Sequence, residues 1–145
     1  MRIEQLHDVT PEVAEAVERL FPQLTTSVPC PDATALDQLV HSVGTSLLVV
    51  REPDEAGPII ALGALAVFHV PTGIHAVIED VVVDEPFRGR GIGEALVRQL
   101  IDLARLKGAR GVSLTSNPRR VGANRLYLRM GFRIWRTNHY YYILV

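Results

Sequence analysis

The sequence predicts an α/β fold, namely a mixed, mostly antiparallel twisted sheet of about six or seven strands flanked by about four helices. Two observations support this prediction. Runs rich in β-branched and apolar residues follow one another through the middle of the chain with only turn residues between them. Later segments with apolar residues at helical spacing alternate with short strands, which is typical of a parallel crossover.

Length and composition favour one domain, residues 1–145, since a chain of 145 residues buries enough surface to sustain its own core. The formal charge of −1 gives no general attraction to nucleic acid or to an anionic membrane, so we expect neither partner. The longest apolar run, 59–67, is far shorter than a membrane span, and residues 1–20 are acidic and amphipathic, unlike a signal peptide. We therefore expect a cytoplasmic protein.

The N-terminal third predicts one strand and two helices. Residues 2–6 alternate in hydropathy as an edge strand does. Thr10, with a proline directly after it, offers an N-cap for a helix that continues through Leu20. A second helix is predicted from about 33 to 43, with Asp32 as its cap.

Three successive strands are predicted at 46–51, 59–70 and 74–84, and their short connections imply an antiparallel meander. The middle run is nearly all apolar, as expected of a central strand covered on both faces. A helix that ends at Gly108 and a strand at 111–116 then most simply form a right-handed crossover. This would place strands 74–84 and 111–116 side by side, with ends that splay apart and open a slot for a ligand.

The last part of the chain predicts a short helix over 120–130 and two final strands, 132–137 and 139–145. The apolar end, 140–145, either pairs with a second copy of the chain or completes the sheet of its own monomer. Of these two arrangements we favour the homodimer.

The loop that follows the valine-rich strand end indicates the function. Its glycines alternate with other residues at a helix N-terminus, where backbone N–H groups without partners and the helix dipole favour an anion. Glycine lacks the Cβ that would obstruct the anion, and arginine adds donors suited to phosphate. The pattern predicts a pyrophosphate cradle, and its alternative is a tight turn with solvated arginines. The cradle consists of Arg88, Gly89, Arg90, Gly91, Ile92 and Gly93.

Two common phosphate-binding loops do not fit this spacing. A dinucleotide fingerprint needs glycine one position beyond Gly93, where Glu94 stands, and a P-loop needs lysine and a hydroxyl residue in place of Glu94 and Ala95. The remaining pattern, Arg88-x-x-Gly91-x-Gly93 between a strand and a long helix, resembles the signature of the GNAT superfamily of acyl-CoA-dependent N-acyltransferases. In that family the loop holds the pyrophosphate of coenzyme A.

A second motif, Ala123–Phe132, supports the same resemblance. It is similar to the late helix of the superfamily, in which an Asn/Ala-rich first turn precedes a Leu-Tyr pair and the helix closes with Gly-Phe. Two motifs in the right order, separated by one helix and one strand, are more specific than either alone. The resemblance covers residues 59–137 well and the N-terminal third only loosely, although that third helps to form the acceptor wall in the family.

The resemblance implies an N-acetyltransferase that moves an acetyl group from acetyl-CoA to a primary amine of a small molecule or protein by direct attack, with coenzyme A as product. Backbone groups of Val81, Val82 and Val83 would bind the pantetheine arm and polarise the acetyl carbonyl. Tyr127, which matches the tyrosine of the family, would protonate the departing thiolate, although without the motif a core tyrosine would be favoured. Asn124 is a candidate hydrogen-bond partner of the cofactor arm.

Glu79 and Asp80 interrupt an apolar strand just before the cradle, and a carboxylate in a sheet either faces solvent or serves a function. Some members of the superfamily use a glutamate of this strand as a general base, often through water. Glu79 is therefore the candidate base, with Asp80 on the other face. An exposed or ion-paired carboxylate fits equally well, and His75 and His69 are substitutes for the base.

No metal site is expected, because the histidines lack ligand spacing and Cys30 is the only cysteine. Asn117 is either a turn residue or a contact of the cofactor arm, and Arg119 and Arg120 either meet the 3′-phosphate or are solvated. Two other functions stay open at this point. They are a non-catalytic acyl-CoA-binding or sensing module and an interaction domain for an unrelated nucleotide.

Overall fold

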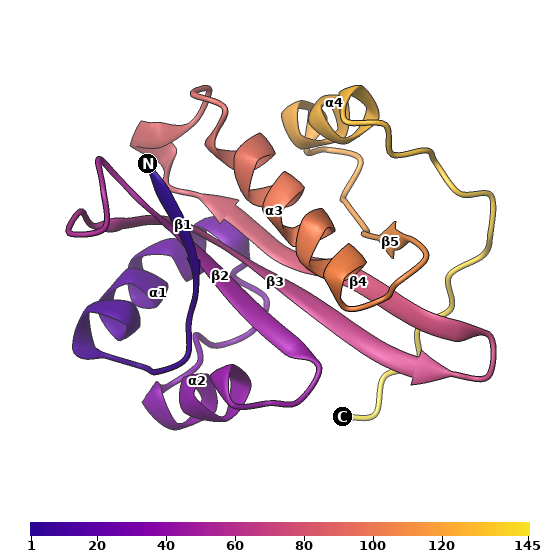
Figure 1. Ribbon diagram of the computed structural model, residues 1–145, viewed down its shortest axis with the longest axis horizontal. Coiled ribbons are helices and arrows are strands. Elements are labelled where there is room, and N and C mark those ends of the chain that lie inside the picture. The colour runs from indigo at the N-terminus through magenta and orange to yellow at the C-terminus, as the bar shows by residue number, and fades with distance from the viewer. The chain divides into compact units, whose positions relative to one another are not determined.

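The computed structural model describes residues 1–145 and confirms the mixed α/β class (Figure 1). Its one sheet has five strands in the order β1-β2-β3-β4-β5, instead of the six or seven predicted. The first four strands are antiparallel, which confirms the meander, and β5 runs parallel to β4. The strands are β1 (Arg2–Gln5), β2 (Thr45–Arg51), β3 (Ile59–Val70), β4 (Gly73–Val83) and β5 (Val112–Ser113).

The predicted strands at 132–137 and 139–145 are wrong, since both segments lack regular secondary structure. Their composition favours extended backbone, but a strand is stable only when a neighbouring backbone takes up its hydrogen bonds. No ladder pairs either segment with another strand. Their large apolar residues are exposed: Ile134, Trp135, Tyr140, Tyr141, Tyr142, Ile143, Leu144 and Val145.

Both predicted N-caps of the first two helices are confirmed. The hydroxyl of Thr10 accepts a hydrogen bond from the Val13 N–H at 3.3 Å, and the carboxylate of Asp32 accepts one from the Ala35 N–H at 2.8 Å. The first helix runs past its predicted end at Leu20, whereas the second stops earlier than predicted. The helices are α1 (Pro11–Leu24), α2 (Ala33–Val40), α3 (Ile92–Leu106) and α4 (Val121–Arg129), with a 3-10 turn η1 (Glu85–Phe87) before α3.

The chain divides into two compact units, residues 1–115 and 116–145. The first unit holds the whole sheet with α1, α2 and α3, and the second holds α4 and the C-terminal segment. In the first unit α1 contacts β3 and β4, α2 contacts β2, and α3 contacts β2, β3 and β4 (Figure 1). None of the helices has the length and apolar content to cross a membrane.

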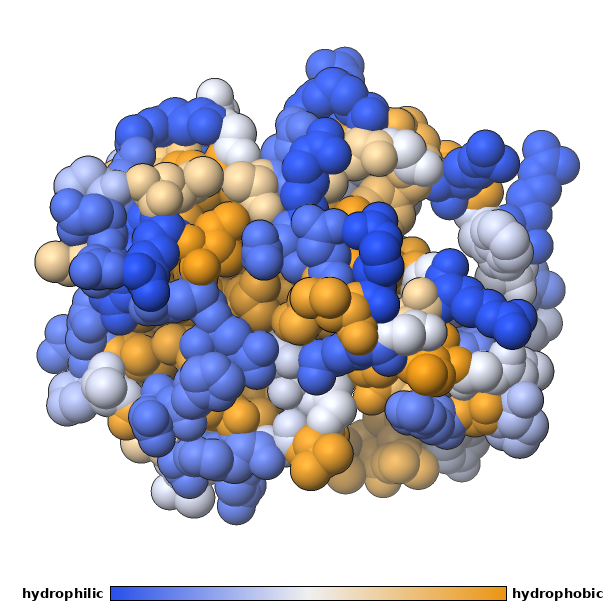
Figure 2. All heavy atoms as spheres, viewed as in Figure 1, coloured by the Kyte–Doolittle hydropathy of each residue, from blue (hydrophilic) through white to orange (hydrophobic).

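The helices of the first unit cover the two faces of the sheet. A Cβ built on Gly63 would lie 3.3 Å from Leu96 and 3.2 Å from Leu100 of α3, so this helix rests directly on β3. Outside the core, the surface seen in Figure 2 mixes hydrophilic residues with apolar patches. The core cluster on the opposite face, beneath α1 and α2, consists of Leu6, Val13, Ala16, Val17, Leu20, Leu36, Leu47, Val49, Ile59, Leu62 and Val82.

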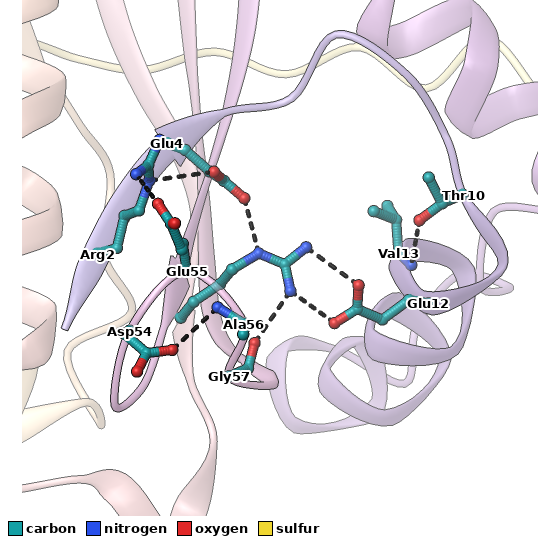
Figure 3. Close-up of polar contacts among 10 residues, drawn as sticks. Arg2, Glu4, Thr10, Glu12, Val13, Asp54, Glu55, Ala56 and Gly57 are labelled. Atoms are coloured by element: carbon teal, nitrogen blue, oxygen red, sulfur yellow. Dashed lines mark hydrogen bonds and ion pairs between the residues drawn. The ribbon is translucent and has the colours of Figure 1, made fainter.

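Arg51, the last residue of β2, binds Glu4 of β1, Glu12 at the start of α1 and Gly57 of the loop after β2; these three partners are labelled in Figure 3. Its Nε donates to Glu4 at 2.7 Å, its Nη1 to Glu12 at 2.6 Å and to the Gly57 carbonyl at 3.0 Å, and its Nη2 to Glu12 at 3.1 Å. Hydrogen bonds to Glu12 and Glu4 raise the pKa of Arg51, and the bond from Arg51 lowers the pKa of Glu12. This cluster fixes the N-terminal end of α1 on the sheet.

We expect Arg51→Met to lower the free energy of unfolding by about 2–3 kcal/mol, because the Gly57 carbonyl and two carboxylates lose a buried charged donor. Glu12 stays partly hydrated, which keeps the loss below that of a fully buried broken pair. The control is Arg105→Met, which removes an exposed pair with Asp102 and should change the stability by less than about 0.5 kcal/mol. Urea unfolding measures both variants, and equal losses would contradict the prediction.

Candidate active site

A β-bulge in β4 lies just before the glycine loop. The register of the β3–β4 ladder shifts between Leu62 and Ala64, so Gly63 opposes both Asp80 and Val81. Asp80 has a φ of 54°, which is the only positive φ at a residue other than glycine. The bulge removes Asp80 from the simple alternation of faces that the sequence predicted. The next residue, Val81, then faces the α3 side of the sheet, beside Gly63.

β5 accompanies β4 for only a short distance. The parallel ladder consists of Ala76 with Val112 and Val77 with Ser113, which confirms the predicted neighbours but shortens the strand predicted at 111–116. The ladder ends at Val77. The second half of β4 therefore continues to the glycine loop after β5 has ended.

The glycine loop has the backbone that an anion site requires. Gly89 and Gly91 have φ values of 76° and 78°, and a Cβ built on either would meet no atom within 4 Å. The bond from the Ala95 N–H to the Gly91 carbonyl, 3.0 Å long, closes the first turn of α3. The N–H groups of Ile92 and Gly93 therefore have no partner within the helix, and they lie at the positive end of its dipole, directly after two glycines whose Cβ positions are open.

The two arginines of the loop bind protein groups. The Nε of Arg88 donates to the Val83 carbonyl at 2.9 Å, and its Nη2 donates to the Gln23 side chain at 3.0 Å. Arg90 pairs with Glu52 at 2.6 Å. The sequence predicted both guanidinium groups as phosphate donors. In this conformation they brace the loop, which leaves the backbone N–H groups of the first turn of α3 as the donors for an anion.

Asp84, the residue after β4, is buried and carries two side-chain contacts from α1. Gln23 donates from Nε2 to Asp84 Oδ1 at 2.8 Å, and Arg19 forms an ion pair with Oδ2. Sequence reasoning did not single out these three residues. Their contacts join positions 61 and 65 apart in the chain, and no local pattern marks such a pair.

Glu79 lies on the same face of the sheet as Ala64, its direct partner on β3, which packs against the core beneath α1 and α2. Its side chain is exposed, but partial desolvation raises the pKa of its carboxyl, and the negative charge of Asp80 raises it further. A carboxyl with a raised pKa is better suited to accept a proton near neutral pH than an ordinary glutamate.

The two substitute bases lie at the opposite end of β4 from the glycine loop. His75 Nε2 lies 3.0 Å from the Thr72 hydroxyl, and its ring stacks at 5.6 Å on that of Phe68. His69 pairs with Ile74 beside the hairpin turn. Neither histidine is close to the loop along the sheet, because each strand residue advances about 3.3 Å.

The second unit contains the predicted tyrosine. Tyr127 is 8% exposed, and its ring meets that of Phe132 edge-on, with centroids 5.7 Å apart. Desolvation raises the pKa of the Tyr127 phenol, while the charge of Arg120 acts in the opposite direction. The phenol is therefore protonated at neutral pH and is available as a proton donor.

The asparagines of the second unit hold its first turn together. The side-chain amide of Asn124 donates to the Asn117 carbonyl at 3.0 Å, and the side chain of Asn117 accepts from the Arg119 N–H at 2.9 Å. Asn117 thus has the turn role that the sequence left open. Among the predicted site residues, Glu79, 81–83 and the glycine loop come together in the first unit, and Asn124 and Tyr127 share α4 of the second.

Comparisons with known proteins extend across both units. Glucosamine 6-phosphate N-acetyltransferase 1 of Oryza sativa subsp. japonica is 34% identical over 119 residues, which cover 78% of this chain and 70% of that protein. Glucosamine 6-phosphate N-acetyltransferase of Trypanosoma brucei brucei is 35% identical over 91 residues, which cover 63% of this chain and half (50%) of that protein.

Solved structures share the fold along nearly the whole chain. An acetyltransferase of Trypanosoma brucei has 25% identity and a TM-score of 0.76, with 98% of this chain and 99% of that one covered. An aminoglycoside acetyltransferase from an uncultured soil metagenomic sample, in complex with sisomicin, has 20% identity and a TM-score of 0.84, with 99% and 96% covered. The latter likeness shows the fold alone.

A model of the acetyltransferase (GNAT) family matches residues 12–132, a range that contains the glycine loop and the Ala123–Phe132 motif. The resemblance predicted from these two motifs is confirmed. The chain belongs to the acetyltransferase (GNAT) family and is an N-acetyltransferase.

Proposed function

We propose that the protein binds acetyl-CoA and transfers its acetyl group directly to a primary amine of a small molecule or protein. The observation that carries this proposal is the glycine loop at the start of α3, where the N–H groups of Ile92 and Gly93 have no partner within the helix and the Cβ positions of Gly89 and Gly91 are open. A pyrophosphate needs several such donors and the favourable end of a helix dipole. Membership in the GNAT family supports the same ligand.

The cofactor would extend from the glycine loop along the end of β4. The loop 88–93 would hold the pyrophosphate, and Val81–Val83 would lie beside the pantetheine arm, where β5 has already ended. Asn124 stays a candidate contact of the arm through its amide oxygen, because its amide nitrogen already donates to Asn117. Acetyl-CoA itself supplies a thioester carbonyl that is activated toward an amine.

The chain offers a base and an acid for the transfer. Glu79, directly or through water, would accept a proton from the amine, which then attacks the thioester carbonyl carbon. As the carbon–sulfur bond breaks, the Tyr127 hydroxyl would give its proton to the departing sulfur. The raised pKa of Tyr127 keeps its phenol protonated near neutral pH, as an acid requires, and the raised pKa of Glu79 makes its carboxylate a stronger base than that of an ordinary glutamate.

The first acceptor to test is an amino-sugar phosphate. The relatives from rice and Trypanosoma brucei brucei are both named for glucosamine 6-phosphate. Other small amines and protein amines belong in the same panel, because the N-terminal third, which the family resemblance associates with the acceptor, is the region in which that resemblance is weakest.

We expect calorimetry to detect binding of acetyl-CoA and coenzyme A to the wild-type protein and at least a roughly tenfold weaker affinity for Gly91→Ala, because the new Cβ takes up open space at the loop that the pyrophosphate would occupy. The control is Gly108→Ala at the other end of α3, where φ is 84° instead of 78° and a Cβ would also lie 3.2 Å from the Ile74 side chain, so the control is strained at least as much. Both variants bear a similar backbone cost of about 1–2 kcal/mol, so only the first should lose affinity.

Free-thiol release with the acceptor panel completes this test. Transfer to any primary amine supports the proposed reaction. A folded wild-type protein without affinity for coenzyme A or its thioesters contradicts the proposal. Tight binding without thiol release on any acceptor favours the non-catalytic acyl-CoA-binding module instead.

We expect Tyr127→Phe to lower kcat by about 10²- to 10⁴-fold, because the thiolate then leaves without a positioned proton donor. Calorimetry should show unchanged affinity for acetyl-CoA, since the ring and its contact with Phe132 are retained. The matched control is Tyr142→Phe, an exposed tyrosine of the C-terminal segment, which should leave kcat unchanged. An unchanged kcat in Tyr127→Phe would exclude the acid role.

We expect kcat/KM of the wild-type protein to fall as pH is lowered through the raised pKa of Glu79, because the protonated carboxyl cannot accept the amine proton. Glu79→Gln should lower kcat and remove this acidic limb. Asp80→Asn should move the limb to lower pH, since it removes a negative charge that raises the pKa of Glu79. A pH profile that is the same in all three proteins would assign the base to another group.

A further inference from the structure

Gln23 of α1 forms hydrogen bonds with the turn 84–88, which leads into the glycine loop. Its Oε1 accepts hydrogen bonds from the Glu85 N–H and from Arg88 Nη2, both at 3.0 Å. Its Nε2 donates to Asp84 Oδ1 at 2.8 Å. A single amide therefore contacts the first two residues of this turn, Asp84 and Glu85, and its last residue, Arg88.

The chemistry of the partners fixes the orientation of this amide. The oxygen of Gln23 faces only donors, the Glu85 N–H and the guanidinium of Arg88. The nitrogen faces only acceptors, the carboxylate of Asp84 and, at 3.3 Å, the carbonyl of Arg19. A flipped amide would lose all of these bonds. The site needs a donor and an acceptor on one short planar group, and the side-chain amide of glutamine supplies both.

Asp84 is itself bound to the sheet. The hydrogen bonds of Gln23 therefore connect the turn to a rigid element of the fold. Arg19 pairs with the second carboxylate oxygen of Asp84 and also donates from Nη2 to the Ile59 carbonyl at 2.6 Å. The Asp84 N–H donates to the Ile60 carbonyl at 2.8 Å. Both carbonyls belong to the start of β3, which lies in the interior of the sheet.

At its far end the glycine loop is held by the buried side chain of Ile92 and by the pair of Arg90 with Glu52. The space around a Cβ at Gly89 or Gly91 is open, so no side chain packs against the loop at these two positions. The loop instead continues directly from Arg88, which is held by the Val83 carbonyl at 2.9 Å and by Gln23. Loss of this hold would leave the loop to be ordered by the ligand, which weakens binding.

We propose that Gln23 is a positioning residue for coenzyme A, which fixes the turn 84–88 and thereby the direction of the N–H groups in the glycine loop without touching the cofactor. The inference rests on the proposed binding of coenzyme A by this loop. It assigns to the C-terminal half of α1 a role in cofactor affinity that is separate from its apolar contacts. Those contacts come from other residues of the helix: Val13, Ala16, Val17 and Leu20.

The test compares two thioesters in Gln23→Met, a change that keeps the length of the side chain and removes its hydrogen bonds. Acetyl-CoA carries the pyrophosphate, whereas S-acetylpantetheine lacks it. We expect the Kd for coenzyme A and the KM for acetyl-CoA to rise about tenfold, which corresponds to about 1.4 kcal/mol. The kcat at saturating acetyl-CoA and the kcat/KM for S-acetylpantetheine should stay within about twofold of the wild-type values.

The matched control is Gln38→Met on the exposed side of α2, which should leave all of these constants unchanged. Equal losses on the two thioesters would indicate a merely structural role and would overturn the inference, as would an unchanged affinity for coenzyme A. A wild-type protein that does not bind coenzyme A would instead remove the proposed function itself. The two failures are thus distinguishable.

Discussion

The backbone N–H groups at the start of α3 are the constraint on which the rest of the site depends. An anion can rest on them only if no side chain stands in front of them and the loop keeps its direction. Gly89 and Gly91 meet the first condition through left-handed backbone and open space. The turn 84–88 meets the second, because its polar groups are tied to Gln23 and to the sheet. An anion site of this kind therefore needs open space beside the N–H groups and a loop backbone that is held in place by hydrogen bonds.

The side chains at the end of β4 face both sides of the sheet, because the bulge shifts the order in which successive side chains alternate between the two faces. Glu79, before the bulge, shares a face with Ala64 and the core beneath α1 and α2. Val81, after the bulge, approaches the α3 side, where a Cβ on Gly63 would lie 3.3 Å from it. One short stretch of strand thus presents a carboxylate to one face and an apolar wall to the other. β5 pairs only with Ala76 and Val77 of β4 and ends before this stretch begins.

Two charge clusters fasten α1 to the sheet, one at each half of the helix. Arg51 binds Glu12 near its start, and Asp84 binds Arg19 toward its end. Both Arg51 and Asp84 are buried, and the ion pairs of each group offset the loss of its hydration. The first cluster lies among β1, β2 and the loop after β2, and it stabilises the folded protein. The second borders the glycine loop, and it connects the position of the helix to the shape of the site.

Local sequence determined the N-caps at Thr10 and Asp32, the bounds of β3 at 59–70 and the glycine loop, because capping, periodicity and glycine backbone act within a few residues of each other. The motifs also determined the family. Tertiary structure alone decided the bulge at Asp80, the partners of the loop arginines, the contacts of Gln23 and the absence of strands after residue 132. Each of these depends on which distant backbone or side chain is near, and a strand-forming composition without a pairing partner remains unpaired.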